Sequence, residues 1–258
     1  MPTILEMGTY PRLDCALGTT GLMRQALSQA VHYARHRQAF GAALIDQPLM
    51  RNVLADMALE VEAAVALALR LARTFDAQQD EAQALLRRLL TPAGKYWVCK
   101  RGAELAAEAM EVLGGNGYVE DDVQARIFRE MPVNSIWEGS GNVMCLDVLR
   151  ALAKSPRSVD ALAAELSPAQ GRNAEFDRHV RGLQQALRAP DAAQSAARRI
   201  TQDIVLAVQA ALLLQHGPAS VAEAFCASRL GGEWGCTFGT LPSGADFDTL
   251  LGRALQME

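Results

Sequence analysis

One stretch decides the fold, residues 81–113, and it reads EAQALLRRLLTPAGKYWVCKRGAELAAEAMEVL. Apolar residues recur along it at spacings of three and four, which is the period of an amphipathic helix. The residues that set this period are Leu85, Leu86, Leu89, Ala93, Trp97, Ala106 and Met110. Pro92 is expected to kink the helix, and the glycines at 114, 115 and 117 are expected to end it. The sequence therefore predicts one long central helix.

Similar periods on either side predict a bundle. Upstream, residues 14–40 form one pattern that closes with Gly41 in a left-handed cap, and residues 48–75 form a second that begins at Pro48. Downstream, shorter patterns cover 121–130 and 142–154. Aromatic residues make up 5% of the chain and β-branched runs are scarce, which favours helix over sheet. We therefore predict an all-α fold, an antiparallel helical bundle over residues 1–154.

A second region, residues 155–258, begins where serine and proline interrupt the pattern at 155 and 156. Helical patterns cover 172–188, 191–216 and 218–230. The glycine-rich stretch 231–239 is expected to be irregular, and a last short helix follows it. The complete prediction is a helical bundle with a helical C-terminal extension.

Composition and charge exclude several classes of protein. Half of the 258 residues are hydrophobic, which excludes a disordered chain, and the formal net charge of -4 provides no overall basic field for a polyanion. The five cysteines form no Cys-x-x-Cys pair and no histidine stands at metal-ligand spacing, so we predict neither a disulfide framework nor a metal. The sequence shows no membrane span and no signal peptide. These features favour a cytoplasmic protein in a reducing environment.

Three short motifs are candidates for function. The first is EVLGGNGYVED at 111–121, whose glycines open the backbone to a phosphate or a flavin edge, although such a run is more often only a cap and a turn. The second is Glu138, between an indole and a glycine; partial desolvation would suit a general base, and the alternative is a solvated loop acid. In the third, at 35–41, Arg37 offers a fork for a pyrophosphate and Phe40 a face for a ring, or the basic residues only complement the helix dipole.

The order of these motifs resembles the C-terminal helical domain of the acyl-CoA dehydrogenases. That order is Arg-x-x-Phe-Gly at 37–41, the glycine run, and Trp-Glu-Gly-Ser at 137–140. The residues that meet the family pattern around the glycines are Glu111, Gly114, Gly115, Gly117, Tyr118, Asp121, Arg126 and Glu130. Segments 47–51, 108–115 and 129–142, with 176–178, 183–185 and 187–190 in the tail, are similar to the AidB-type flavoproteins of the bacterial response to DNA alkylation.

The resemblance implies a role for each matching residue. It makes Glu138 the catalytic base that removes the α-proton of an acyl-CoA while FAD accepts the β-hydride. It places Arg37 and Phe40 against the FAD of a neighbouring subunit in a homo-oligomer, a dimer or a tetramer, and Arg12 beside the acyl-CoA. The other residues that it assigns to FAD are Gln47, Glu111, Gly114, Gly115, Ser140 and Asn142.

Two departures and one rival interpretation accompany the resemblance. Glu111 stands where most relatives carry glutamine, and the N-terminal helical and middle β domains of the family have no counterpart in this sequence. We therefore expect a truncated gene product, a cloned piece or a subunit completed by another polypeptide, with weak or no dehydrogenase activity alone. The rival is a non-catalytic helical oligomerisation module.

A third interpretation is a DNA-binding protein that keeps the flavin as a structural group. AidB-type relatives are credited with binding duplex DNA through their C-terminal region. Within 170–199 of this chain, arginines exceed acids by three, whereas the whole tail is slightly acidic. The arginines that could face phosphates are Arg178, Arg181, Arg188, Arg198 and Arg199, and the alternative is an ordinary solvated helix face.

Overall fold

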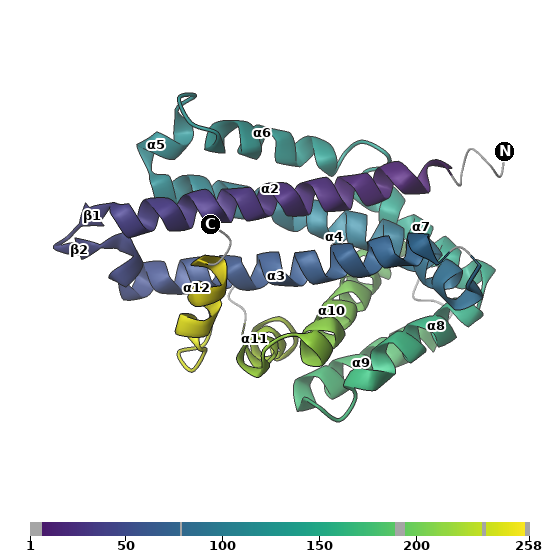
Figure 1. The fold of residues 1–258 in the computed structure, drawn as a ribbon. Coiled ribbons are helices and arrows are strands. Elements are labelled where there is room, and N and C mark those ends of the chain that lie inside the picture. Colours follow the sequence, from purple (N-terminus) through teal and green to yellow (C-terminus); the bar gives the residue numbers. More distant parts are fainter. Residues whose placement is uncertain (1–6, 78, 189–193, 234–235, 256–258) are drawn as a thin grey trace.

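The computed structural model describes residues 7–77, 79–188, 194–233 and 236–255, and these are almost entirely helical. The first part of the chain contains the helices α2 Thr9–His36, α3 Pro48–Asp76, α4 Glu81–Leu113, α5 Gly115–Tyr118, α6 Gln124–Asn134 and α7 Gly141–Lys154. The long helices α2, α3 and α4 lie side by side and consecutive ones run in opposite directions (Figure 1). The prediction of an all-α bundle is confirmed.

The two longest predicted patterns agree closely with α3 and α4. Helix α4 begins after Asp80, whose carboxylate accepts a hydrogen bond from the Gln83 amide at 3.2 Å. It continues through Pro92, which is buried inside it, and ends at Gly114, which has a positive φ of 61°. Since this φ strains any residue with a Cβ, the helix ends where the glycine run begins.

The end of the first helix differs from the prediction. Helix α2 ends at His36, and the next residues form a small hairpin of β1 Gln38–Ala39 and β2 Ala42–Ala43. Its two central residues, Phe40 and Gly41, have φ values of 54° and 85°. Two positive φ values in a two-residue connection are typical of a type I′ hairpin turn. Gly41 therefore serves this turn and does not cap α2.

The extension is also helical, and its first helix begins earlier than the first predicted helical pattern, which started at residue 172. Its elements are α8 Arg157–Leu166, η2 Ser167–Ala169, α9 Ala174–Arg188, η3 Gln194–Ala196, α10 Ala197–His216, α11 Ala219–Phe225, the π-helical η4 Cys226–Leu230 and α12 Phe247–Leu255. Helix α8, which was not predicted, begins directly after Pro156 and packs on α4. Proline is compatible with a helix start, so it does not mark an irregular linker here. The predicted start of α10 at Asp191, and residues 189 and 190 of the tail resemblance, lie outside the described residues.

Bundle and extension share one core. Helix α10 packs on α3, α4 and α7, and α12 packs on α3 and α2. At their junction the guanidinium of Arg229, from η4, lies 2.6 Å from the Asp56 carboxylate and 3.1 Å from that of Glu60, both in α3. Arg101 of α4 pairs with Glu60 at 3.2 Å from the opposite side. The extension therefore supplies a counter-ion to carboxylates buried inside the bundle.

None of the described helices is long and apolar enough to cross a membrane. Within the described ranges, no group of three or more histidine, cysteine or acidic side chains could hold a metal ion. The five cysteines are free thiols, of which Cys236 is exposed and the other four are buried.

Candidate functional site

The turn between α6 and α7 carries Glu138, the predicted base. Glu138 has a positive φ of 57°, which is uncommon for a residue with a side chain, and Gly139 follows at 114°. A Cβ on Gly139 would lie 2.4 Å from the Met144 methyl group, and residues with a Cβ rarely adopt its φ, so glycine is favoured at that position. The chain thus turns sharply at Glu138 and enters α7 at Gly141.

Side chains from the other helices hold this turn by its carbonyl oxygens. Arg12 of α2 donates from Nε to the Glu138 carbonyl at 3.0 Å and from Nη1 to the Asp147 carboxylate at 2.9 Å. Asp147, in α7, also accepts from Arg88 of α4 at 2.7 Å. Lys95 of α4 donates from Nζ to the Gly139 carbonyl at 2.7 Å. Arg12 of α2 and Lys95 of α4 therefore hold the carbonyls of two consecutive residues, Glu138 and Gly139.

A pocket of about 580 Å³ opens beside this turn, between the start of α2 and the end of α6. Pro11, Leu22 and Trp137 provide apolar walls, and the carboxylates of Asp14, Glu130 and Glu138 stand along it. Cys15 also lines the pocket. Burial raises the pKa of its thiol, whereas a hydrogen bond from the Trp137 indole N–H to the sulfur tends to lower that pKa. The pocket combines apolar walls with carboxylates able to accept a proton.

The structure distinguishes the two alternatives for Glu138, a partly desolvated carboxylate and a solvated loop acid. The side chain of Glu138 is exposed in this chain, as expected of a solvated acid, and its neighbour Trp137 remains 51% exposed. The α6–α7 turn lies at the surface, and in the described part of the chain no element covers it. The backbone of the predicted base is fixed, whereas its carboxylate faces solvent.

Two other predicted residues, Ser140 and Asn142, lie where the α6–α7 turn enters α7, next to the extension. Ser140 precedes the first turn of α7, and Asn142 lies within it. The Asn142 side chain accepts a hydrogen bond from Nε of Arg198, in α10, at 2.9 Å. The Arg198 guanidinium also lies over the Tyr96 ring, 6.0 Å from its centre. The extension therefore contacts the loop that carries the predicted base.

The remaining predicted cofactor residues lie at the other end of the bundle. Gln47 donates to the Ala39 carbonyl at 2.8 Å and fastens the hairpin, at whose tip the Phe40 ring is 97% exposed. Arg37 and Glu111 are exposed at the ends of α2 and α4. A Cβ on Gly114 or Gly115 would meet no atom within 4 Å, so the space above both glycines is open. The predicted residues at this end therefore present the Arg37 guanidinium, the Phe40 ring, the open backbone of Gly114 and Gly115, and the Glu111 carboxylate.

One chain does not bring the two groups of residues together. Arg12 and Arg37 lie near opposite ends of α2, which separates them by about 37 Å at the helical rise per residue. Lys95 and Glu111 are separated along α4 by about 24 Å for the same reason. In Figure 1 the hairpin and α5 lie at one end of the long helices and α7 lies at the other. A single ligand that touches both groups must bridge two copies of the chain or lie along its length.

The arginines predicted for nucleic acid are divided between two helices. Arg178 of α9 pairs with Glu175 one turn before it, and Arg198 of α10 is directed to Asn142. Arg181 and Arg188 of α9 and Arg199 of α10 are exposed. Two of the five arginines thus have protein partners, and phosphate contact stays a prediction for all five.

Sequence reasoning did not single out Lys95, Asp147 or Cys15. The signal for Lys95 was available, because it is the only charged residue between Leu89 and Cys99, in the most buried part of α4. A lysine in such a stretch is rarely buried without a specific acceptor. Asp147 and Cys15 carry no comparable signal, since their positions depend on how α2 and α7 pack.

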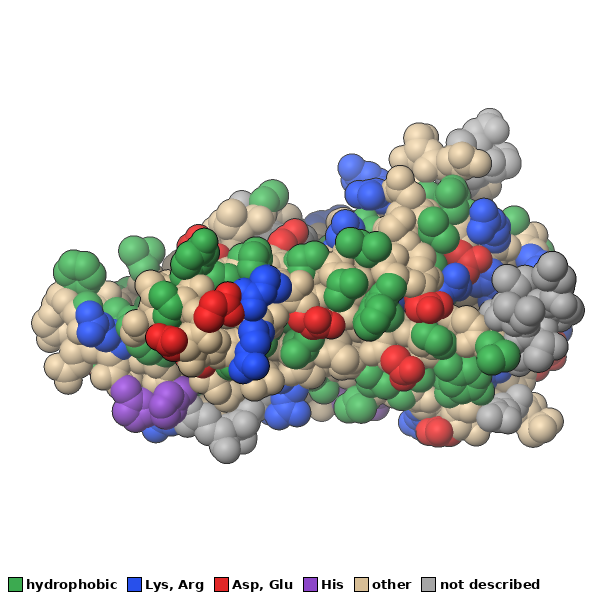
Figure 2. Space-filling model, turned by 90° about the horizontal axis from the view of Figure 1, so that it is seen from above, with side chains coloured by type: hydrophobic (Ala, Val, Ile, Leu, Met, Phe, Trp, Pro, Cys, Tyr) green, Lys and Arg blue, Asp and Glu red, His purple; other side chains and the backbone are tan. Residues whose placement is uncertain are grey.

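Hydrophobic and charged side chains alternate along the α5–α6 side of the molecule (Figure 2). The large hydrophobic side chains exposed on these elements and on the following turn are Tyr118, Val119, Phe128, Val133, Ile136 and Trp137. The turn that carries Glu138 is therefore continuous with a partly apolar surface.

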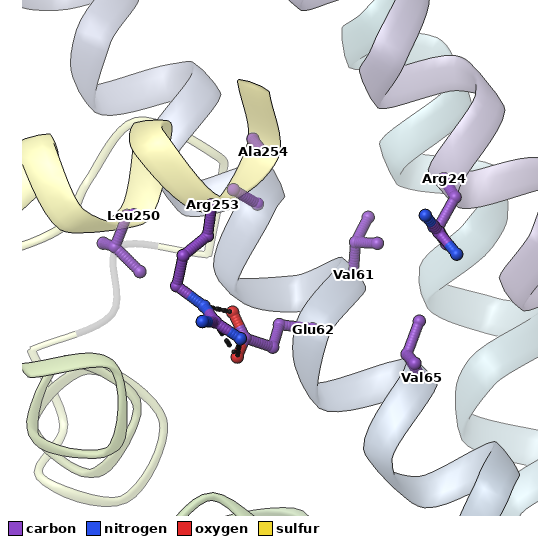
Figure 3. Close-up of a pocket in the computed structure, with 8 residues that line it drawn as sticks. Arg24, Val61, Glu62, Val65, Leu250, Arg253 and Ala254 are labelled. Carbon is purple, nitrogen blue, oxygen red and sulfur yellow. Dashed lines mark hydrogen bonds and ion pairs between the residues drawn. The ribbon is translucent and has the colours of Figure 1, made fainter. Parts of the chain in front are cut away.

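Two smaller hollows lie on another side, against α3. One, of about 290 Å³, is lined by Val61 and Val65 of α3 with Arg24 of α2 and Leu250 of α12 (Figure 3). Arg253 of α12 pairs with Glu62 across its edge, with Nε 2.8 Å from the carboxylate. The second, of about 390 Å³, lies beyond this pair, between α3 and the end of α10. None of the residues predicted for function lines either hollow.

Comparison with known proteins agrees with this fold and this turn. The family model of the acyl-CoA dehydrogenase C-terminal domain matches residues 1–153, which include the hairpin, the glycine run and the turn at Glu138. The chain belongs to the acyl-CoA dehydrogenase family. It is 50% identical to the putative acyl-CoA dehydrogenase AidB of Escherichia coli over 223 residues, which cover 86% of this chain and 41% of that protein. It is therefore an AidB-like member of the family.

Two further comparisons, one of sequence and one of structure, extend the likeness into the extension. Acyl-CoA dehydrogenase family member 11 of Caenorhabditis elegans is 28% identical over 213 residues, 81% of this chain and 34% of that protein. The crystal structure of Caenorhabditis elegans ACDH-11 in complex with C11-CoA has a TM-score of 0.77 at 26% identity and covers 95% of this chain and 45% of that one. The chain thus spans about two fifths or less of the length of these two curated relatives.

Proposed function

We propose that this chain supplies the general base and part of the FAD surface of an AidB-like acyl-CoA dehydrogenase. The observation that carries the proposal is the turn at Glu138, which places a carboxylate at the mouth of an apolar pocket and is fixed by Arg12 and Lys95. The match of the family model to this segment supports the proposal.

Glu138 would accept the α-proton of an acyl thioester bound in the pocket. Proton removal needs the carboxylate within hydrogen-bond reach of that carbon, and a fixed backbone reduces the number of positions the carboxylate can adopt. Trp137 and Leu22 would contact the acyl group, since they form the apolar wall beside Glu138. A second polypeptide that covers the turn would desolvate the carboxylate and make it a stronger base.

The residues at the hairpin end fit a flavin dinucleotide in their chemistry. FAD, when bound, supplies the hydride acceptor of the reaction. The Arg37 guanidinium suits a pyrophosphate, the open backbone at Gly114 and Gly115 admits close approach, and the exposed Phe40 ring offers a face to an aromatic ring. Glu111 is the one unfavourable charge, and it would have to turn away from a phosphate.

The separation of the two groups of residues supports a shared site. Arg37 and Phe40 of one chain lie too far from Glu138 of the same chain to serve one flavin ring, because Arg12, which holds the Glu138 carbonyl, is separated from Arg37 along α2 by about 37 Å. A second copy, with its hairpin end next to the first copy's α7, would unite them. We therefore include a homo-oligomer, a dimer or a tetramer, in the proposal.

The exchange of α-protons isolates the base from the flavin. We expect the chain to catalyse exchange of the α-hydrogens of butyryl-CoA with D₂O, followed by NMR, and Glu138→Gln to abolish that exchange. Glu130→Gln is the matched control, since Glu130 lines the same pocket on α6. Exchange that survives in Glu138→Gln, or that is lost equally in Glu130→Gln, would remove Glu138 from its proposed role.

A separate titration tests the flavin surface. Added FAD should show perturbed visible absorbance and should raise the melting temperature of the chain, and both effects should weaken in Arg37→Gln. Arg24→Gln, on the same helix but at neither predicted site, is the control. FAD that leaves both the absorbance and the melting temperature unchanged would contradict the flavin part of the proposal.

A further inference from the structure

The Lys95 side chain lies directly beneath the turn that carries the proposed base. Its Nζ is the only cationic atom that reaches the Gly139 carbonyl among the described residues, at 2.7 Å. Lys95 is fully buried, with no exposed side-chain area. A buried ammonium without a carboxylate bonded to it is costly in free energy, so its presence in the core calls for a specific role.

We infer that Lys95 is a positioning residue for Glu138: its ammonium holds the Gly139 carbonyl and thereby sets the backbone conformation from which the Glu138 carboxylate reaches the pocket. This inference rests on the proposed function of Glu138, but the conformation it describes can be measured without any activity. Lys95 touches no substrate in this arrangement, so it acts only through the turn.

The conformation of the turn shows why such a hold is needed. Glu138 has φ of 57°, a region that residues with a Cβ populate rarely, and the next residue is also at positive φ. Left alone, a Glu-Gly segment at the surface would relax to more extended conformations. Arg12 holds the Glu138 carbonyl and Lys95 the next one, so two cations on two different helices oppose that relaxation.

The two cations differ in what else they bind. Arg12 is half-buried and shares Asp147 with Arg88, so its position is fixed by a network of charges. Lys95 lies near the thiols of Cys15 and Cys99, the like charge of Arg12 and the carboxylate of Glu138. Burial, the strongest influence, lowers the pKa of Lys95. Removal of Lys95 would therefore take away both the hydrogen bond to Gly139 and a positive charge close to Glu138.

Replacing Lys95 by an apolar side chain of similar length tests the hydrogen bond and the charge while it preserves the packing. Lys95→Met fills nearly the same volume without a charge, so the bundle should remain folded and gain stability from the loss of a buried ammonium. In the variant, Glu138 and Gly139 should lose the backbone ¹³C shifts of a positive-φ turn and show those of a mobile or extended one. Lys154→Met, an exposed lysine at the end of α7, is the control and should leave both residues unchanged. A folded Lys95→Met with wild-type shifts at Glu138 and Gly139 would overturn the inference.

Function provides a second readout that a purely structural role would not move. In Lys95→Met we expect α-proton exchange to fall about tenfold or more, because the Glu138 carboxylate is no longer held in one position. Lys95→Ala leaves room for propylammonium, which should restore part of the exchange, whereas 1-propanol of the same size should not. Equal effects of the two additives would contradict the role of the charge.

The exchange assay and the chemical shifts test the proposed function and the role of Lys95 separately. If the wild-type chain catalyses no exchange, the proposed function fails, and the chemical shifts still decide whether Lys95 sets the turn. If Lys95→Met and Lys95→Ala do not fold, the wild-type protein gives the answer: the ¹⁵N-labelled Nζ of Lys95 should exchange its protons with water slowly at low temperature. A fast-exchanging Lys95 ammonium, as on an exposed lysine, would overturn the inference.

Discussion

The Arg229 guanidinium of the extension lies 2.6 Å from the Asp56 carboxylate of the bundle, and both side chains are enclosed by protein. Glu60 and Arg101 complete the cluster, and the Phe238 ring packs against Arg101 with its centre 5.1 Å from the guanidinium carbon. Asp56 also accepts a hydrogen bond from the Gly239 amide at 3.0 Å. Two buried carboxylates of one region are therefore balanced by charges that come from both regions.

Loss of the guanidinium should destabilise the whole chain. We expect Arg229→Met to lower the free energy of unfolding by about 3–5 kcal/mol, because it leaves Asp56 and part of Glu60 without a counter-ion inside the protein. Arg253→Met is the control: its pair with Glu62 is partly exposed, and its loss should cost at most about 1 kcal/mol. Urea unfolding of both variants measures the difference, and similar losses in the two would contradict the prediction.

Acid should destabilise the protein through the same cluster of buried charges. Burial tends to raise the pKa of Glu60, but Arg101 and Arg229 outweigh it, and the net pKa is lowered. A lowered pKa in the folded state means that this contribution to stability is complete above the unfolded value, about 4.3, and is lost as the pH falls through the folded value. The urea midpoint of the wild type should therefore fall below pH 4 more steeply than that of Glu60→Gln. Parallel curves for the two proteins would show that Glu60 does not report acid unfolding.

Alkaline pH should weaken the fold through the buried thiols. Burial raises the pKa of Cys99 to about 11 and that of Cys226 to about 12. A raised pKa in the folded state means that stability is complete below the unfolded value, about 8.5, and is lost as the pH rises towards the folded value. The free energy of unfolding should thus fall between pH 8.5 and 11, and less so in Cys226→Ala. Cys236→Ser, at an exposed thiol, should follow the wild type.

Substitution of Gly139 should damage the turn and leave the rest of the bundle in place. Gly139→Ala places a Cβ 2.4 Å from the Met144 methyl group and forces alanine to a φ of 114°. We expect a loss of about 1–3 kcal/mol in stability and loss of α-proton exchange. Gly182→Ala, in α9 with open space around it, should instead stabilise the protein by about 0.5–1 kcal/mol. A Gly139→Ala protein as stable and active as the wild type would refute the tight fit at this turn.

Complementation between variants tests the shared site. Arg37→Ala and Glu138→Gln should each abolish flavin reduction by an acyl-CoA when present in every subunit. If one site takes Arg37 from one copy and Glu138 from another, randomly mixed dimers should recover about one quarter of the wild-type rate, because half are mixed and each has one intact site. Recovery should require subunit exchange, and mixing without any recovery would place both residues in one chain's site.

The fold could be predicted from sequence where helix period and helix ends agree. Pro48 and Leu113, for example, fall at the predicted ends of α3 and α4, because proline starts a helix readily and Gly114 ends one. The hairpin was missed, since two residues per strand are too few to show a period of two. Helix α8 was missed because Pro156, a poor helix residue in general, stands immediately before its first residue.

The site could be predicted in its residue types but not in its geometry. The family resemblance identified Glu138 and Arg12, and the structure brings both to one turn. Sequence gave no sign that Arg12 reaches the carbonyl of Glu138, or that Arg198 of the extension binds Asn142, because both contacts join residues from distant helices. The exposure of Glu138 was also out of reach, since it depends on what covers the turn.

The Arg229 cluster has a genetic consequence. A premature stop codon anywhere between residues 155 and 228 would leave Asp56 without Arg229 in the interior, and Glu60 with Arg101 alone. The product would be a substrate for cellular proteases and not a stable shortened protein. Such alleles should therefore behave as complete losses of the protein.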